Sequence, residues 1–152
     1  ALAYAAGFCL NLGHLSAIRA AAEALPAAGA AARIGLGVAL PLFMAGLPEE
    51  VFFRGILQSR LEVTAGRAVA IPLTALLFTA WHLPTRYLLA QGVEGRAGDL
   101  GSVLLGTGVP VLLVGLVFGL AWDRYRNLPT LIAAHWGVDT LPAVRGLLGG
   151  SF

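Results

Sequence analysis

The sequence has few charged residues and almost no cysteine. Charged residues make up 12% of its 152 residues, about half the usual share for a soluble domain. All ten basic residues are arginine, because the chain contains no lysine, and they exceed the eight acids by only two. With no basic run to support one, we predict no nucleic-acid partner. The single cysteine, Cys9, excludes an intrachain disulfide and a zinc cluster built from cysteines.

Apolar residues dominate what remains. They account for 58% of the chain, and the mean hydropathy is +0.81. A soluble core of this size cannot bury so much apolar surface, so the composition indicates a multi-pass membrane protein. The chain begins at Ala1 and is apolar from the start, without the positive region of a signal peptide. We therefore expect a fragment of a longer protein.

Long apolar runs alternate with short polar links. A hydrocarbon core of about 30 Å needs roughly 20 apolar residues per helix. We therefore predict an all-α, multi-pass transmembrane helical bundle of about four spans, preceded by a partial one. The four spans cover residues 34–59, 68–83, 100–122 and 130–141. We expect Pro48 to kink or restart the first helix, and Pro84 and Pro142 to end the second and the last. Gly115 and Gly119 predict close helix packing.

The predicted organisation has three parts. Residues 1–33 hold a partial N-terminal span and an interfacial segment, 34–142 form the core of the bundle, and 143–152 are a C-terminal tail. The short links at 60–67 and 123–127 carry four arginines, which favours the cytosolic side for that end of the bundle.

Ionisable residues lie within or beside the apolar runs. A charged group at the middle of a bilayer costs roughly 2.5 to 3.5 kcal/mol. A chain that carries such a load usually turns these residues toward a polar cavity, so a functional site is the default hypothesis. The residues are Glu49, Glu50, Arg54, His82, His135 and Asp139.

The two acids of the first span differ in their possible partners. Glu50 and Arg54 are four residues apart, which puts them on one helix face and allows an ion pair. This pair is most simply a structural bridge. Glu49 lies about 100° around the helix from Glu50 and is left to point elsewhere.

The histidines belong to two other helices. His135 and Asp139 are four residues apart on the last helix, and His82 stands alone on the second. Each has a structural interpretation, His82 as a hydrogen-bonded packing residue and the pair as a bond within one helix. Together with Glu49 they are harder to explain by packing, because all four are costly to bury. We therefore predict that three helices bring these four residues to one interior point.

Three motifs occur in a fixed order along the chain. Residues 49–54 read Glu-Glu-Val-Phe-Phe-Arg, residues 78–82 read Phe-Thr-Ala-Trp-His, and residues 135–139 read His-Trp-Gly-Val-Asp. They match the EExxxR, FxxxH and HxxxN/D motifs of the CPBP family, which comprises CAAX proteases and bacteriocin-processing intramembrane proteases. Over about residues 34–142 the sequence resembles this family.

The resemblance implies a membrane endopeptidase, related to the type II CAAX prenyl endopeptidases and the Abi immunity proteins, that uses a glutamate-activated water. By the family's pattern, Glu49 activates the water and His82 helps to hold it. His135 and Asp139 stabilise the oxyanion, while the acid and arginine of the ion pair support the site. The implied partners are a peptide or membrane-protein substrate and the lipid bilayer. The implied location is a prokaryotic cell membrane.

The role of Asp139 stays open at this point. The family often has Asn there, which donates a hydrogen bond to an oxyanion, whereas an ionised Asp has no proton to donate. Asp139 is therefore protonated by desolvation, turned to orient His135, or bound to a metal. Glu49, His82 and His135 form a possible zinc set, with Asp139 as a further ligand. Because a zinc-bound Glu49 would require a different base, we favour a mechanism without a cofactor and keep Zn²⁺ as the alternative.

Two other functions fit the same pattern. An ion-coupled transporter also places acids and histidines in the membrane, and it would show ion flux across vesicles. A catalytically silent membrane protein of the immunity or binding type would keep the motifs as a structural cluster.

Overall fold

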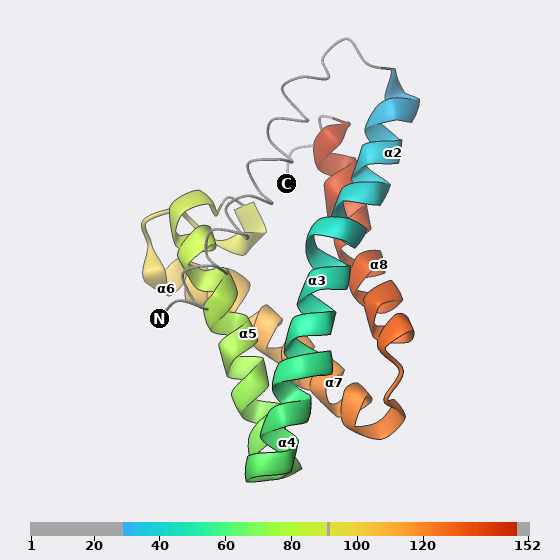
Figure 1. The fold of residues 1–152 in the computed structure, drawn as a ribbon. Helices are drawn as coiled ribbons and strands as arrows, with labels where there is room; N and C mark the ends of the chain where they lie inside the picture. The colour runs from blue at the N-terminus through green and yellow to red at the C-terminus, as the bar shows by residue number, and fades with distance from the viewer. Residues whose placement is uncertain (1–28, 91, 149–152) are drawn as a thin grey trace.

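The computed structural model describes residues 29–90 and 92–148, which fold into four helical rods (Figure 1). The first rod contains α2 (Ala30–Pro41), α3 (Leu47–Glu50) and α4 (Ser59–Ala65), joined by π-helical turns over Leu42–Gly46 and Val51–Gln58. The second rod is α5 (Arg67–Leu89). The third contains α6 (Leu100–Val103), a π-helical segment (Leu104–Gly108) and α7 (Val109–Tyr125), and the fourth is α8 (Leu128–Leu147). The predicted all-α bundle is confirmed.

The connections between the rods are short. Gly66, with a φ of 76°, turns the chain from α4 into α5, and Arg126, with a φ of 50°, ends α7. Both lie in the left-handed region, which glycine enters without steric cost. The longest connection contains a 3₁₀ turn, Gly92–Glu94, and ends at Asp99, whose side chain accepts a hydrogen bond from the Ser102 N–H and caps α6.

Three of the rods are long and apolar enough to cross a membrane: Ala30–Ala65, Arg67–Leu89 and Leu100–Tyr125. They expose large apolar side chains such as Leu105 and Val117, as lipid-facing surfaces require. The protein is therefore an integral membrane protein. The rod α8, over which the sequence predicts the fourth span, is not among these three. The predicted partial span and interfacial segment lie almost entirely in residues 1–28, outside the described residues.

The prolines interrupt the helices less than the sequence predicts. Pro48 does begin a short α-helix, since it lies in the first turn of α3, but the rod runs through it. The predictions that Pro84 and Pro142 end their helices are wrong, because α5 continues to Leu89 and α8 to Leu147. A proline removes one backbone donor, and neighbouring helices in a membrane bundle compensate for that loss.

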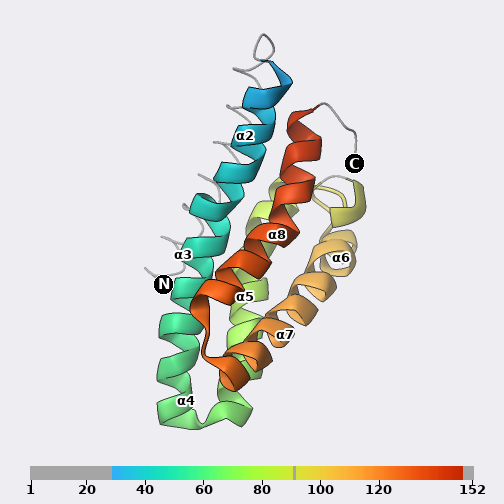
Figure 2. The ribbon, with the colours of Figure 1, turned by 90° about the vertical axis from the view of Figure 1, so that its right-hand side faces the viewer.

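Small residues allow the rods to pack closely. A Cβ atom added at Gly115 would lie 3.2 Å from the Cβ of Ala75, so α5 and α7 meet backbone to backbone there. At Gly37 an added Cβ would lie 2.7 Å from a methyl group of Val144, where α2 runs beside α8 (Figure 2). The prediction of close packing at Gly115 is confirmed. The elements that carry the three motifs also contact one another, because α3 contacts α8 and the π-helical segment that follows α3 contacts α5.

Candidate active site

Glu49 and Glu50 follow one another on α3 but face different partners. Their side chains are almost inaccessible, with 7% of Glu49 and 0% of Glu50 exposed. Glu50 faces Arg54 on its own helix and His135 on α8. Glu49 faces the histidines of two other helices. The 100° step between adjacent helical residues thus divides the two carboxylates between two tasks.

One oxygen of Glu50 joins two charged or polar partners. Glu50 Oε1 accepts a hydrogen bond from Arg54 Nη1 at 2.7 Å and lies 2.7 Å from His135 Nδ1. The Arg54 guanidinium lies between the rings of Phe78 at 4.4 Å and Phe118 at 5.4 Å, a cation–π arrangement that stabilises a buried positive charge. The expected ion pair therefore forms, and it extends to the last helix.

His82 is fixed by the turn of helix before it. Its Nδ1 lies 2.8 Å from the carbonyl oxygen of Phe78, which only accepts hydrogen bonds, so Nδ1 carries the proton. The other nitrogen, Nε2, lies 3.7 Å from Glu49 Oε2. In the neutral ring this nitrogen is an acceptor that faces the carboxylate.

His135 lies between three carboxylates. Nδ1 faces Glu50 as described, while Nε2 is 3.8 Å from Glu49 Oε2 and 3.3 Å from Asp139 Oδ2. Asp139 is the most accessible of the three acids, with 37% of its side chain exposed. The helix pair His135–Asp139 therefore reaches from the buried carboxylates to the edge of the cluster.

The four predicted residues do come together. Glu49 Oε2 faces the Nε2 atoms of both His82 and His135, and Asp139 joins the group through His135. Glu49 Oε2 is also buried without a hydrogen-bond partner. A buried carboxylate oxygen is rarely left unpaired, so this atom marks the point where a water molecule or a reacting group fits.

A family profile matches most of this region. The profile of the type II CAAX prenyl endopeptidase Rce1-like family matches residues 32–141, more than two thirds of the chain. The chain belongs to this family. All six site residues fall within the matched region, and the family membership predicted from the three motifs is confirmed. No curated protein and no solved structure matches the chain.

The positions of the nitrogen and oxygen atoms around Glu49 bear on whether these residues could bind Zn²⁺. Both Nε2 atoms converge on Glu49 Oε2, as histidine ligands would. Among residues 29–90 and 92–148, however, no group of three or more His, Cys, Asp or Glu side chains is arranged to hold a metal ion. Zn²⁺ therefore stays an alternative to the metal-free mechanism.

An apolar groove of about 400 Å³ lies on the neighbouring face of α8, between α8 and α2. None of the six site residues lines it, although two of its residues are adjacent in sequence to site residues. The lining consists of Val38, Trp136, Gly137, Thr140, Leu141 and Val144. The groove therefore lies beside the site, on another side of α8, and is not part of it.

A second polar cluster, partly buried, lies further along the first rod, and it was not predicted from the sequence. Gln58 Nε2 donates to the Gly119 carbonyl and to Glu62 Oε1, both at 2.9 Å. Glu62 Oε2 pairs with Arg126 Nη2 at 2.5 Å. We call these four residues the lower clamp. Arg54, Gln58 and Glu62 follow one another at steps of four residues. This spacing is visible in the sequence, but no motif elsewhere in the chain indicated what they would contact.

Phe118 was also missed. It lies in the uncharged run of α7, where nothing in the sequence distinguishes it from its lipid-facing neighbours. In the structure its ring is 5.9 Å from that of His135 and 5.4 Å from the Arg54 guanidinium. Phe118 therefore forms a wall of the site from the third rod.

Proposed function

We propose that the chain is an intramembrane endopeptidase in which Glu49 activates the water that attacks a peptide bond. One observation carries the proposal: the unpaired Glu49 Oε2 faces His82 Nε2 at 3.7 Å and His135 Nε2 at 3.8 Å. Both separations exceed a direct hydrogen bond, and both suit a single water molecule that bridges the three atoms.

The proton transfers follow from the nitrogen that each histidine presents. His82 presents Nε2 as an acceptor and so holds one hydrogen of the water. Glu49 takes the other proton as the water oxygen bonds to the amide carbon. When the C–N bond breaks, Glu49 returns this proton to the leaving nitrogen, which gives an amine and a carboxylic acid. The acid then loses its proton to Glu49 or solvent and becomes the new carboxylate.

The developing oxyanion is assigned to His135. Glu50 and Asp139 flank its ring, and two adjacent carboxylates favour the doubly protonated imidazolium. The N–H at Nε2 then donates to the oxyanion, while Glu50 and Arg54 fix the ring from behind. Asp139 Oδ2 lies 3.3 Å from His135 Nε2, where it can orient the ring.

The Asp139→Asn variant tests that orienting role. Asparagine has nearly the same size and still offers a hydrogen-bond acceptor to His135. We expect kcat/KM to stay within about tenfold of the wild-type value, measured at several pH values, because a positioning group contributes less than the general base. A loss as large as that of a Glu49 variant would instead assign Asp139 to the chemistry.

The decisive experiment is hydrolysis in isotopically labelled water. The purified chain in lipid nanodiscs is incubated with prenylated and unprenylated peptides in H₂¹⁸O, and the products are analysed by mass spectrometry. We expect one ¹⁸O atom in the new carboxylate and no product from Glu49→Gln. The matched control is Glu62→Gln, a similarly buried acid in the lower clamp, which should remain active.

Three outcomes would contradict this proposal. Proton- or ion-coupled flux in vesicles without hydrolysis would indicate a transporter. Unchanged biological activity in Glu49→Gln would indicate a silent immunity-type protein. Complete loss of hydrolysis after stringent metal removal, with recovery on adding zinc, would replace the metal-free mechanism by a zinc-dependent one.

A further inference from the structure

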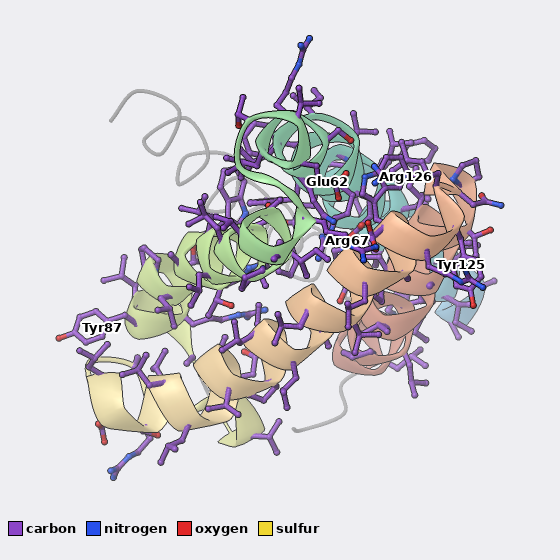
Figure 3. The ribbon with its side chains drawn as sticks, turned by 90° about the horizontal axis from the view of Figure 1, so that it is seen from below. Glu62, Arg67, Tyr87, Tyr125 and Arg126 are labelled. Carbon is purple, nitrogen blue, oxygen red and sulfur yellow. The ribbon has the colours of Figure 1, made fainter. Side chains whose placement is uncertain are left out.

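Four arginines surround the end of the molecule where the first three rods terminate or turn. Arg60 lies on α4, Arg67 begins α5, and Arg124 and Arg126 lie at the end of α7. Figure 3 looks onto this end, with Arg67 and Arg126 among the labelled residues. We call these four residues the arginine rim.

The rim is one connected surface, because side chains tie the three helix ends together. Trp122 Nε1 donates to Ser59 Oγ at 3.2 Å, which joins α7 to α4. Asp123 lies 3.8 Å from Arg67 and 3.6 Å from Arg126, which joins α7 to α5. The positive groups of three helices therefore share one face.

The acids at this end do not neutralise the rim. Glu62 is only 10% exposed and is held by Arg126 and Gln58, while Asp123 is the single remaining acid. Residues 59–67 and 122–127 thus contain four arginines and two acids, a surplus of two positive charges. Arg60 and Arg124 are exposed, and within the described part of the chain neither has an acidic partner.

The loop at the opposite end provides a contrast. There, Arg86 pairs with Glu94 and Arg96 pairs with Asp99, each at 2.8 Å. Residues 86–99 contain two arginines and two acids, so this loop carries no net charge. Both arginines of this loop therefore have an acidic partner, whereas Arg60 and Arg124 of the rim have none among the described residues.

The rim lies where lipid headgroups would contact it. It occupies the ends of three membrane-spanning rods, and Tyr125 beside it is 73% exposed, as aromatic residues at a membrane interface are. Arginine binds phosphate oxygens through two parallel N–H groups and stays charged at all relevant pH values. We propose that the arginine rim binds the phosphate of an anionic phospholipid and so places this end in the leaflet rich in such lipids.

The test compares lipid retention by native mass spectrometry and thermal unfolding in vesicles. Wild-type protein is placed in phosphatidylcholine alone or in phosphatidylcholine with phosphatidylglycerol. We expect about a tenfold preference for the anionic lipid, which weakens as salt is raised. The double variant Arg60→Gln/Arg124→Gln should lose most of this preference, and peptide hydrolysis should be unaffected.

A matched control separates the rim from overall charge. Arg124→Gln and Arg96→Gln remove the same charge from exposed positions at opposite ends, and only Arg124→Gln should weaken the preference. An equal effect of both variants, or no preference in the wild type, would refute the proposal. Stabilisation by inorganic phosphate equal to that by phosphatidylglycerol would show a site for free phosphate and would also refute it.

Discussion

Two carboxylates of low exposure on the same rod, Glu49 in the site and Glu62 in the lower clamp, have opposite surroundings. Their side chains are almost equally buried, at 7% and 10% exposed. Both oxygens of Glu62 are paired, with Gln58 and with Arg126. Glu49 Oε2 has no hydrogen-bond partner and faces two imidazole nitrogens across a gap. The two side chains differ little in exposure, but Glu49 Oε2 lacks the partners that both oxygens of Glu62 have.

The largest expected effect comes from removing the charge of each acid in turn. Glu49→Gln should lower kcat/KM by about 10⁴-fold while leaving the unfolding midpoint nearly unchanged, because the base is lost and little pairing is disturbed. Glu62→Gln should keep activity within a few-fold and lower the free energy of unfolding by about 1 to 3 kcal/mol, because Arg126 and Gln58 lose an ionised acceptor. Peptide hydrolysis and denaturant unfolding in the same nanodiscs measure both. Equal losses of activity would remove the distinction between the two acids.

The arginines of the two clusters sharpen the comparison. Arg54 is fully buried beside Glu50, so Arg54→Gln leaves an uncompensated buried charge and should lower the free energy of unfolding by about 3 to 5 kcal/mol. Arg126 is 47% exposed, and Arg126→Gln should lower it by about 1 kcal/mol or less. If Arg54→Gln does not fold, the yield of folded protein is compared with that of Arg54→Lys, which keeps the positive charge. A much lower yield for Arg54→Gln then reports the cost of losing that charge. Similar stabilities for the Arg54 and Arg126 variants would contradict the difference in burial.

A smaller effect is expected where the lower clamp meets α7. At Gly119 an added Cβ would lie 3.1 Å from Ile71 Cγ2 and 3.2 Å from Gln58 Oε1, so Gly119→Ala should lower the free energy of unfolding by about 1 to 3 kcal/mol. The control is Gly137→Ala on α8, where an added Cβ meets nothing within 4 Å and alanine favours the helix. Thermal unfolding of both variants measures the difference. A Gly119→Ala protein as stable as the wild type would show that Ile71 and Gln58 move to accommodate the added methyl group.

The smallest effect lies outside the membrane, at the loop between α5 and α6. The Ser102 N–H, with help from Arg96, lowers the pKa of Asp99 below its usual value of 3.8. A lowered folded-state pKa gives stability that is present above the usual value and is lost as pH falls through the lowered one. We expect a slight extra fall in the unfolding midpoint of the wild type over that acid range, absent in Asp99→Asn. An identical pH profile for both proteins would show that this cap does not contribute.

Local patterns in the sequence predicted much of the fold and of the site. Apolar runs predicted the rods, and a spacing of four predicted the Glu50–Arg54 pair. Three motifs predicted that His82, His135 and Asp139 lie near Glu49. Patterns of this kind report neighbours along one helix. The proline predictions failed because a helix end in a bundle depends on what packs against it, as at Pro84.

Contacts between distant residues had no such signal. The contact of His135 with Glu50 joins residues 85 positions apart, and the bond from Gln58 to the Gly119 carbonyl joins residues 61 apart. A backbone carbonyl leaves no trace in side-chain patterns. Gly119 was correctly expected to allow close packing, but that packing also brings its carbonyl within reach of a glutamine.

A single atom, Glu50 Oε1, serves both the architecture of the bundle and its reactive histidine. A substitution that removes this carboxylate would release the arginine and the imidazole in the same event. Loss of catalysis and loss of native structure should therefore coincide in such a variant. An engineer who wishes to retune the histidine through this carboxylate has to strengthen the scaffold elsewhere, since that oxygen cannot be replaced for one duty without forfeiting the other.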